Sequence, residues 1–202
     1  MECTVRWTSG MTFLAETGSG HVAAMDGAPD GGGQNLAPRP MEMVLVGTGG
    51  CTAYDVVVIL KKSGQPVTGC EVKLTSERAE TGSNHLVAMD GAPDGGGRNL
   101  APRPMEMVLL GTGGCTAYDV VVILKKSGQD VTGCEVKLTA ERATTDPKVF
   151  TKIHMHWTVR GRGLKRNLVE HAVRLTHEKY CSATAMLIKT AEITRDFEVV
   201  EA

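Results

Sequence analysis

The chain has 202 residues, 42% of them hydrophobic and 22% charged, with a formal net charge of −1. A chain of this length can bury one large core or two small ones. The near-zero charge excludes the basic surface that attracts nucleic acid or anionic lipid, and an aromatic content of 4% argues against base-stacking surfaces. We therefore expect neither nucleic acid nor a membrane among its partners.

The beginning of the chain predicts short strands followed by a loop. The stretches CTVRW (3–7) and MTFLAET (11–17) favour extended structure, and GSG then turns the chain into HVAAMDG (21–27). The loop APDGGGQNLAPR (28–39) lacks the Gly-Lys-Ser/Thr of a phosphate-binding loop, so it predicts a connection. The start has no apolar signal-peptide core, and the longest apolar run, VVVIL, is far shorter than a membrane span. We therefore expect a soluble cytoplasmic protein.

A long helix is predicted twice, from Pro40 and again from Pro104. Proline suits the first turn of a helix, and Glu42 or Glu106 then complements the positive end of the helix dipole. The sequence KKSG predicts the helix end. Each glycine of the internal GTGG costs about 1 kcal/mol relative to alanine. We therefore expect another backbone to pack closely there, with a π-bulge or a break in the helix as the alternative.

The rest of the chain predicts strands around a second helix. The stretches 134–143 (CEVKLTAERA) and 148–161 (KVFTKIHMHWTVRG) alternate between apolar and polar residues, as half-buried antiparallel strands do. Residues 164–180 form an amphipathic helical pattern, and CSATAMLIKTA (181–191) continues that helix or starts another. EITRDFEVVEA (192–202) predicts a last strand. One complete unit is thus β-β-α-β-β-α-β, an α+β pattern.

The chain carries an internal duplication. Residues 15–78 and 79–142 are two copies of one 64-residue segment and differ at seven positions, namely Gly20/Asn84, Val22/Leu86, Ala23/Val87, Gln34/Arg98, Val46/Leu110, Pro66/Asp130 and Ser76/Ala140. Two copies are too few for a solenoid. Removing one copy leaves 138 residues, an ordinary single-domain length. The seven differences favour an older duplication, or a join between two related genes, over a simple copying accident.

The six cysteines are candidate functional residues, although their spacing predicts no metal site or cofactor. They are Cys3, Cys51, Cys70, Cys115, Cys134 and Cys181, and none forms a C-x-x-C pair. Cys115 and Cys181 lie in the two long helical patterns. They are either a dithiol pair, in which one thiolate attacks a peroxide and the other thiol resolves the sulfenic acid, or two buried small hydrophobic residues. His154 and His156 alternate on one strand face but have no third metal ligand in the pattern.

The segments PMEMVLLGTGGCTAYDV (104–120) and EKYCSATAML (178–187) resemble the OsmC/Ohr superfamily, and most of all its small OsmC-like redox proteins. The resemblance covers nearly the whole chain once one copy is removed. It implies an α+β homodimer with curved antiparallel sheets around two long central helices. It also implies reduction of organic hydroperoxides at two cysteines, recycled by a dithiol reductant. The matching residues are Cys115 (or Cys51), Cys181, and a glutamate at Glu106 (or Glu42).

One departure from the family pattern keeps a second function open. The characterised peroxidases of the family use an arginine upstream of that glutamate, and neither Arg98 nor Arg103 matches its position. The resemblance therefore implies either a thiol peroxidase, peroxiredoxin-like in its chemistry, or a non-catalytic OsmC-fold protein that binds a small apolar ligand or has a structural role.

The duplication adds a first central helix but no second one. Cys181 therefore has two candidate partners, Cys51 and Cys115. We expect residues 71–202 to form a complete OsmC-like domain and residues 1–70 to be a spare β-β-α half-unit that imitates part of a dimer partner. The alternative is that residues 1–78 join 143–202 and the middle copy is displaced.

Overall fold

The computed structural model describes residues 1–75 and 83–202. In these residues the strands form a single sheet in the order β3-β2-β1-β4-β5-β6. The strands are β1 (Glu2–Ser9), β2 (Thr12–Thr17), β3 (Val22–Asp26), β4 (Asp130–Arg142), β5 (Phe150–Arg162) and β6 (Glu192–Glu201). The helices are α1 (Pro40–Lys62), α2 (Pro104–Lys126), α3 (Arg166–Leu175) and α4 (Ser182–Leu187), with short turns η1 (Pro29–Gly31), η2 (Pro93–Gly95) and η3 (Thr176–Tyr180). The α+β class is confirmed.

The sheet differs in one respect from the expected antiparallel arrangement. Its other neighbouring strands are antiparallel, but β6 runs parallel to β5, with Ile153 opposite Ile193 and Val159 opposite Val199. Parallel neighbours require a crossover connection, which α3, η3 and α4 supply. The alternation of β6 predicts a strand but does not encode its direction.

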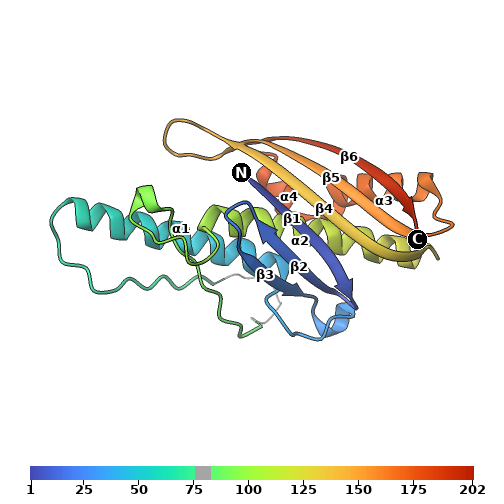
Figure 1. The fold of residues 1–202 in the computed structure, drawn as a ribbon, viewed down its shortest axis with the longest axis horizontal. Helices are drawn as coiled ribbons and strands as arrows, with labels where there is room; N and C mark the ends of the chain where they lie inside the picture. The colour runs from blue at the N-terminus through green and yellow to red at the C-terminus, as the bar shows by residue number, and fades with distance from the viewer. Residues whose placement is uncertain (76–82) are drawn as a thin grey trace.

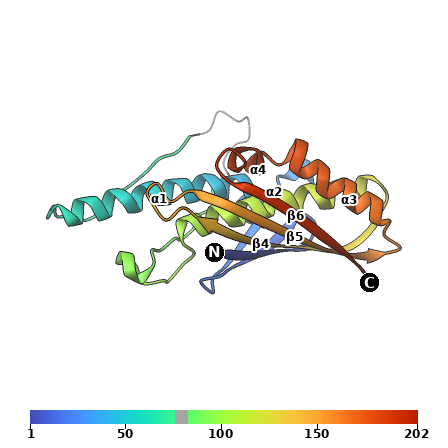
Figure 2. The same ribbon diagram turned by 90° about the horizontal axis from the view of Figure 1, so that it is seen from above.

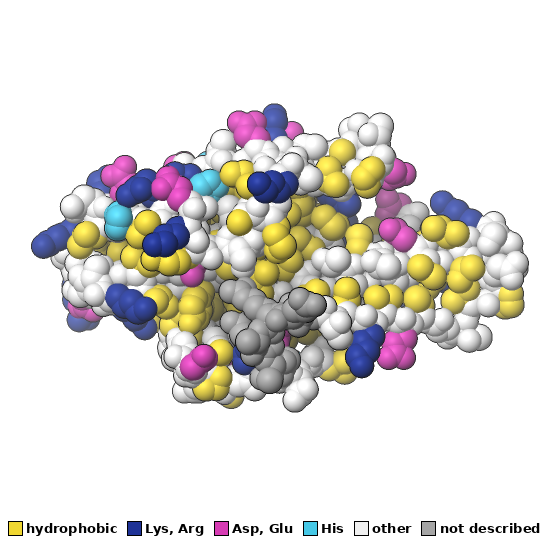
Figure 3. All heavy atoms as spheres, turned by 180° about the vertical axis from the view of Figure 1, so that it is seen from behind, with side chains coloured by type: hydrophobic (Ala, Val, Ile, Leu, Met, Phe, Trp, Pro, Cys, Tyr) yellow, Lys and Arg dark blue, Asp and Glu magenta, His cyan; other side chains and the backbone are white. Residues whose placement is uncertain are grey.

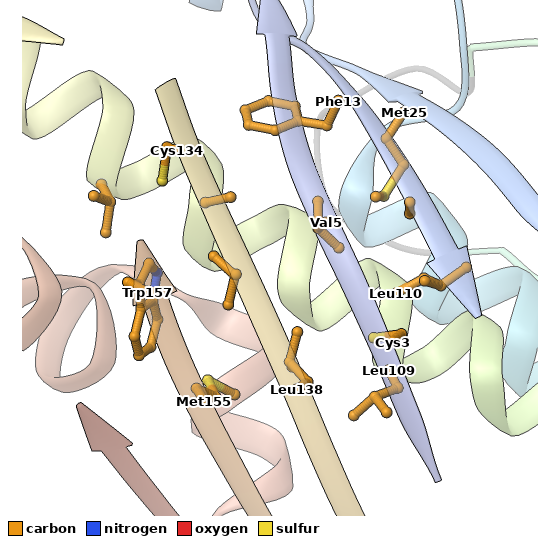
Figure 4. Packing of buried hydrophobic residues seen from close by; sticks show 14 of the residues in the cluster. Cys3, Val5, Phe13, Met25, Leu109, Leu110, Cys134, Leu138, Met155 and Trp157 are labelled. Atoms are coloured by element: carbon orange, nitrogen blue, oxygen red, sulfur yellow. The ribbon is translucent and has the colours of Figure 1, made fainter. Parts of the chain in front are cut away.

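The core lies between the sheet and α2, which runs along one sheet face (Figures 1 and 2). Alternate residues of β1, β4 and β5 point toward the helix, as the period of two requires. Figure 4 shows this layer, in which Val5, Leu138 and Trp157 are fully buried. From α2, Leu109 and Leu110 enter the same cluster.

The nearly identical helices α1 and α2 have different surroundings. In α2, Val120 and Leu124 are 0% exposed, whereas in α1 Val56 is 39% exposed and Ile59 is 63% exposed. The C-terminal half of α1 projects beyond the sheet (Figures 1 and 2), and hydrophobic side chains are spread along this projection (Figure 3). The tertiary surroundings of each copy, not its local sequence, decide which one becomes the core helix.

Both long helices are apolar enough, and long enough, to cross a membrane by composition alone. The sequence prediction considered only VVVIL and missed this property. The apolar stretch of α2 is nevertheless 72% buried within the protein, against 17% for α1. For α2, the apolar composition is that of a mostly buried core helix.

The glycines of the duplicated GTGG sequence let the two long helices touch. A Cβ on Gly111 would lie 2.5 Å from the Pro40 carbonyl oxygen, and a Cβ on Gly47 would lie 2.6 Å from that of Pro104. Any larger side chain would therefore push the helices apart. The expected close backbone approach is confirmed, and both segments remain α-helical through the glycines.

Each copy of the duplicated segment reaches across to the helix of the other copy. The Tyr118 hydroxyl donates to the Gly31 carbonyl (3.0 Å), and the Tyr54 hydroxyl donates to that of Gly95 (2.8 Å). Likewise, Ser19 of the first copy donates to a glutamate of α2, and Ser83 of the second copy donates to a glutamate of α1. We call these four pairs the exchanged contacts. They relate α1 and α2 by an approximate internal two-fold symmetry.

The expected division of the chain into two folding units, 1–70 and 71–202, stays a prediction. The sheet contains strands from both sides of residue 70. Strand β1 pairs with β4, with Val5 opposite Val136. In the described parts of the middle region, 66–75 and 83–103, no strand forms. Residues 76–82, which contain the junction between the two copies, lie outside the described residues.

A buried carboxylate organises the loop after β3. Asp26 is 0% exposed and accepts from the backbone N–H groups of Gly27, Gln34 and Leu36 at 2.8, 2.9 and 3.0 Å. Burial alone would raise the pKa of Asp26, but these bonds outweigh it and the pKa is lowered. Asp90 makes the equivalent bonds in the second copy.

We predict that Asp26 makes the protein sensitive to acid. Because its folded pKa is depressed, its stabilisation is present above the unfolded value of 3.8 and is lost as the pH falls through the folded pKa. In urea titrations from pH 6 to about pH 2.5, Asp26→Asn should show a smaller loss of unfolding free energy than the natural chain. Equal curves for the natural chain and Asp26→Asn would contradict the prediction.

Candidate thiol site

The structure brings Cys115 and Cys181 together. Cys115 lies in the middle of α2, and Cys181 lies where η3 ends and α4 begins. The two sulfur atoms and a carboxylate oxygen of Asp119 lie within 4.8 Å of one another. Of the two candidate partners for Cys181, Cys115 therefore belongs to this cluster and Cys51 does not.

A break in the second helical region positions Cys181. After α3 the chain widens into the π-helical turn η3, and Cys181 takes an extended conformation (φ −71°, ψ 103°) before α4 begins. Its N–H donates to the Thr176 carbonyl at 2.9 Å. Its sulfur accepts from the N–H and the hydroxyl of Thr184, at 3.4 and 3.2 Å. Of the two sequence expectations for residues 181–191, a separate helix is the correct one.

The pKa values of the two thiols are shifted in opposite directions. A hydrogen bond from the Cys115 thiol lowers the pKa of Cys181, and the two bonds from Thr184 act in the same direction against the effect of burial. The pKa of Cys115 is raised by donating that bond, by burial, and by the charges of Cys181 and Asp119. The pair therefore holds its first negative charge on Cys181, stabilised by three donors.

Asp119 is a member of the cluster that the sequence reasoning did not single out. Its carboxylate accepts from the Thr176 hydroxyl at 2.8 Å, and burial raises its pKa to about 6. The signal for it was present, because a residue four positions after Cys115 lies on the same helix face. The cluster thus comprises two thiols and one carboxyl group with a hydroxyl partner.

Cys51, the other first-helix candidate, lies in a different environment. It is half-buried on α1, where burial and the charge of Asp55 raise its pKa and the charge of Arg142 opposes them. The Cys51–Asp55 pair repeats the spacing of Cys115–Asp119, but neither residue belongs to the three-residue cluster. The first copy therefore repeats the cysteine and the aspartate of α2, but the duplication contains no second Cys181.

The candidate glutamates act as helix caps. Glu106 accepts from the Arg103 N–H at 2.9 Å and from the Ser19 hydroxyl at 2.7 Å. Glu42 accepts from the Arg39 N–H at 2.9 Å and from the N–H and hydroxyl of Ser83. Both side chains thus close the first turn of a long helix. Their expected role beside the thiols stays a prediction.

A groove of about 1120 Å³ lies apart from the thiol pair. It contains Arg103 beside Glu106, although neither cysteine of the pair lines it. Its lining residues are Met1, Glu2, Gly18, Ser19, Arg103, Glu106, Thr139, Ala140, Glu141, Arg142, Lys152, Ile153, His154, Glu192 and Thr194. We place the chemistry at the sulfur atoms, because the size of a groove says nothing about reactivity.

The remaining cysteines differ in their burial. Cys134 is a buried packing residue whose pKa burial raises to about 12. Cys3 is a buried core residue of β1, and burial raises its pKa as well. Cys70 is exposed, and the described part of its segment forms no strand.

A family model described as OsmC-like protein matches residues 31–91 and 95–195. The chain belongs to the OsmC-like protein family. The first OsmC-like match contains α1 and the second contains α2, α3 and α4, so the duplication is visible as two family matches. The expected resemblance is confirmed.

The chain is also similar to several known proteins. Protein YhfA of Escherichia coli K12 is 52% identical over 123 residues, which are 61% of this chain and 89% of that protein. A hypothetical protein from Aquifex aeolicus VF5 has a TM-score of 0.54 and 28% identity, covering 68% of this chain and 99% of its own. An OsmC-like protein from Mycoplasma pneumoniae, at TM-score 0.51 and 14% identity over 59% and 86% of the two chains, shares the fold.

Proposed function

We propose that this OsmC-like protein reduces organic hydroperoxides with Cys115 and Cys181, as part of a defence against oxidative stress. The observation that carries the proposal is the contact between two sulfur atoms from separate helices, with one sulfur stabilised as a thiolate by the other thiol and by Thr184. A thiolate beside a second thiol is the arrangement that peroxide reduction through a disulfide requires.

The reaction conserves atoms and electrons. One sulfur, as thiolate, attacks the O–O bond of the hydroperoxide; an S–O bond forms, the O–O bond breaks, and the alkoxide leaves and takes up a proton. The second sulfur then attacks the resulting sulfenic acid, an S–S bond forms, and the oxygen leaves as water. A dithiol reductant restores both thiols. We propose a cytoplasmic location, where such reductants are present, and a homodimer of the whole chain.

Peroxide turnover tests this proposal. With an organic hydroperoxide and a dithiol reductant in excess, Cys115→Ser and Cys181→Ser should each lower turnover at least about a hundredfold, because the disulfide cannot form. Cys51→Ser is the matched control and should keep the natural rate. The single variant that retains the attacking sulfur should accumulate a sulfenic acid, which a selective trapping reagent identifies. Equal turnover in all four chains would refute the proposal.

A second candidate function is a non-catalytic OsmC-fold protein. The observation in its favour is that the charge of the Asp119 carboxylate disfavours the thiolate form of both cysteines, whereas efficient thiol peroxidases place a cation beside the reacting sulfur. Absent turnover, together with thermal stabilisation of Cys115→Ser by a hydroperoxide or another apolar ligand, would favour this alternative.

A further inference from the structure

We propose that the reduced cluster of Cys115, Asp119 and Cys181 binds a thiophilic divalent metal ion of the zinc type. Each residue offers one ligand atom, and these three atoms lie within 4.8 Å of one another. The sequence spacing predicts no such site, because the ligands come from two helices that only the tertiary fold brings together.

The separation of the three atoms suits a tetrahedral site. With a Zn–S bond of about 2.3 Å and a Zn–O bond of about 2.0–2.2 Å, tetrahedral ligands lie roughly 3.5–3.8 Å apart. The cluster, whose atoms lie within 4.8 Å of one another, therefore has to contract by up to about 1.3 Å. Cys115 and Asp119 occupy successive turns of the core helix α2, so two of the ligands stand on one rigid element.

Neighbouring hydroxyl groups orient the ligands. Thr176 donates to Oδ2 of Asp119, which fixes the carboxylate plane, and Thr184 holds the sulfur of Cys181. Such outer contacts typically contribute to metal affinity. Cys115 is half-buried, whereas Cys181 is buried.

The ligand set selects the class of metal. Two sulfur ligands favour a borderline-soft ion such as Zn²⁺ over Mg²⁺ or Ca²⁺, which prefer oxygen ligands. Binding needs both sulfurs as thiolates, so it releases whatever S–H protons the reduced pair still carries. The disulfide offers no thiolate, and bound metal in turn occupies the sulfurs that would attack a peroxide. This last consequence rests on the proposed function; metal binding itself does not.

Competition between the reduced full-length chain and a chromogenic zinc chelator tests the site under anaerobic conditions. The natural chain should bind one Zn²⁺ that Cys115→Ser does not hold. Asp119→Asn should weaken binding roughly tenfold or more, whereas Asp55→Asn, at the equivalent position of the first copy, should leave it unchanged. Co²⁺ in place of Zn²⁺ should give the thiolate-to-metal charge-transfer absorption of a tetrahedral site. Equal affinities of the two aspartate variants, or a Co²⁺ spectrum without that absorption, would overturn the proposal.

A second measurement needs no variant and so does not depend on the folding of Asp119→Asn. In the natural chain, Zn²⁺ should slow alkylation of Cys115 and Cys181 several-fold while Cys51 in the same molecule reacts at an unchanged rate. Uniform rates with and without Zn²⁺ would also overturn the site. If Zn²⁺ binds but peroxide turnover is absent, the peroxidase proposal alone fails; if turnover occurs without Zn²⁺ binding, the metal site alone fails.

Discussion

Treatment of the reduced chain with one equivalent of an organic hydroperoxide should join Cys115 to Cys181 in an intramolecular disulfide. The two sulfur atoms already belong to one cluster within 4.8 Å, so a shift of roughly 2–3 Å brings them to the 2.05 Å of an S–S bond. Cys181 immediately precedes the short helix α4, and the start of this helix can adjust more readily than the core helix α2. Peptide mapping after alkylation should find this disulfide and a free Cys51.

The duplicated helix supplies the control for that experiment. Cys51 lies in the same local sequence as Cys115, including an aspartate four residues later. Local sequence therefore cannot account for a difference between them. Cys115→Ser should abolish the disulfide, and Cys51→Ser should leave it intact. A disulfide between Cys51 and Cys181 in the natural chain would show that α1, not α2, carries the reacting thiol.

Leu124→Ala should destabilise the protein strongly, and Leu60→Ala, at the equivalent position of α1, only weakly. Leu124 is 0% exposed and belongs to the core between α2 and the sheet. Truncation of a buried leucine removes apolar contacts and leaves a cavity, which costs about 2–5 kcal/mol. Leu60 is half-buried on the projecting end of α1, so its truncation should cost less than about 1 kcal/mol.

Guanidinium unfolding followed by circular dichroism measures this pair of variants. The midpoint should fall clearly for Leu124→Ala and stay close to the natural value for Leu60→Ala, with similar slopes in all three chains. Comparable losses in both variants would mean that α1 is covered as fully as α2 in solution.

Local patterns in the sequence were sufficient to predict most secondary structure. The alternation around Val136 and Trp157 predicted β4 and β5 because half-buried strands repeat every two residues. Pro104 and Glu106 predicted the start of α2, because proline suits the first turn of a helix and a glutamate there complements the positive end of the helix dipole. The direction of β6 was not predictable in this way, since the same alternation suits a parallel or an antiparallel neighbour.

The arrangement of the two copies could not be read from the sequence for a different reason. Residues such as Tyr54 and Tyr118 have identical neighbours in the chain, so no local signal states which helix enters the core or which loop each tyrosine reaches. The pairing of Cys115 with Cys181 was expected from the family resemblance, with Cys51 left as an equal candidate. Helical spacing alone could have pointed to Asp119. The contact of Thr184 with Cys181 depends on the break at Cys181, which the sequence left open as one of two alternatives.

The exchanged contacts have a thermodynamic consequence for how this protein assembles. They join α1 to α2, whose backbones meet at Gly47 and Gly111, within one covalent chain. Association of these two helices is therefore a unimolecular step, governed by the effective concentration that the intervening chain imposes and not by the amount of protein in solution. The pair formed by α1 and α2 therefore stays assembled at any dilution.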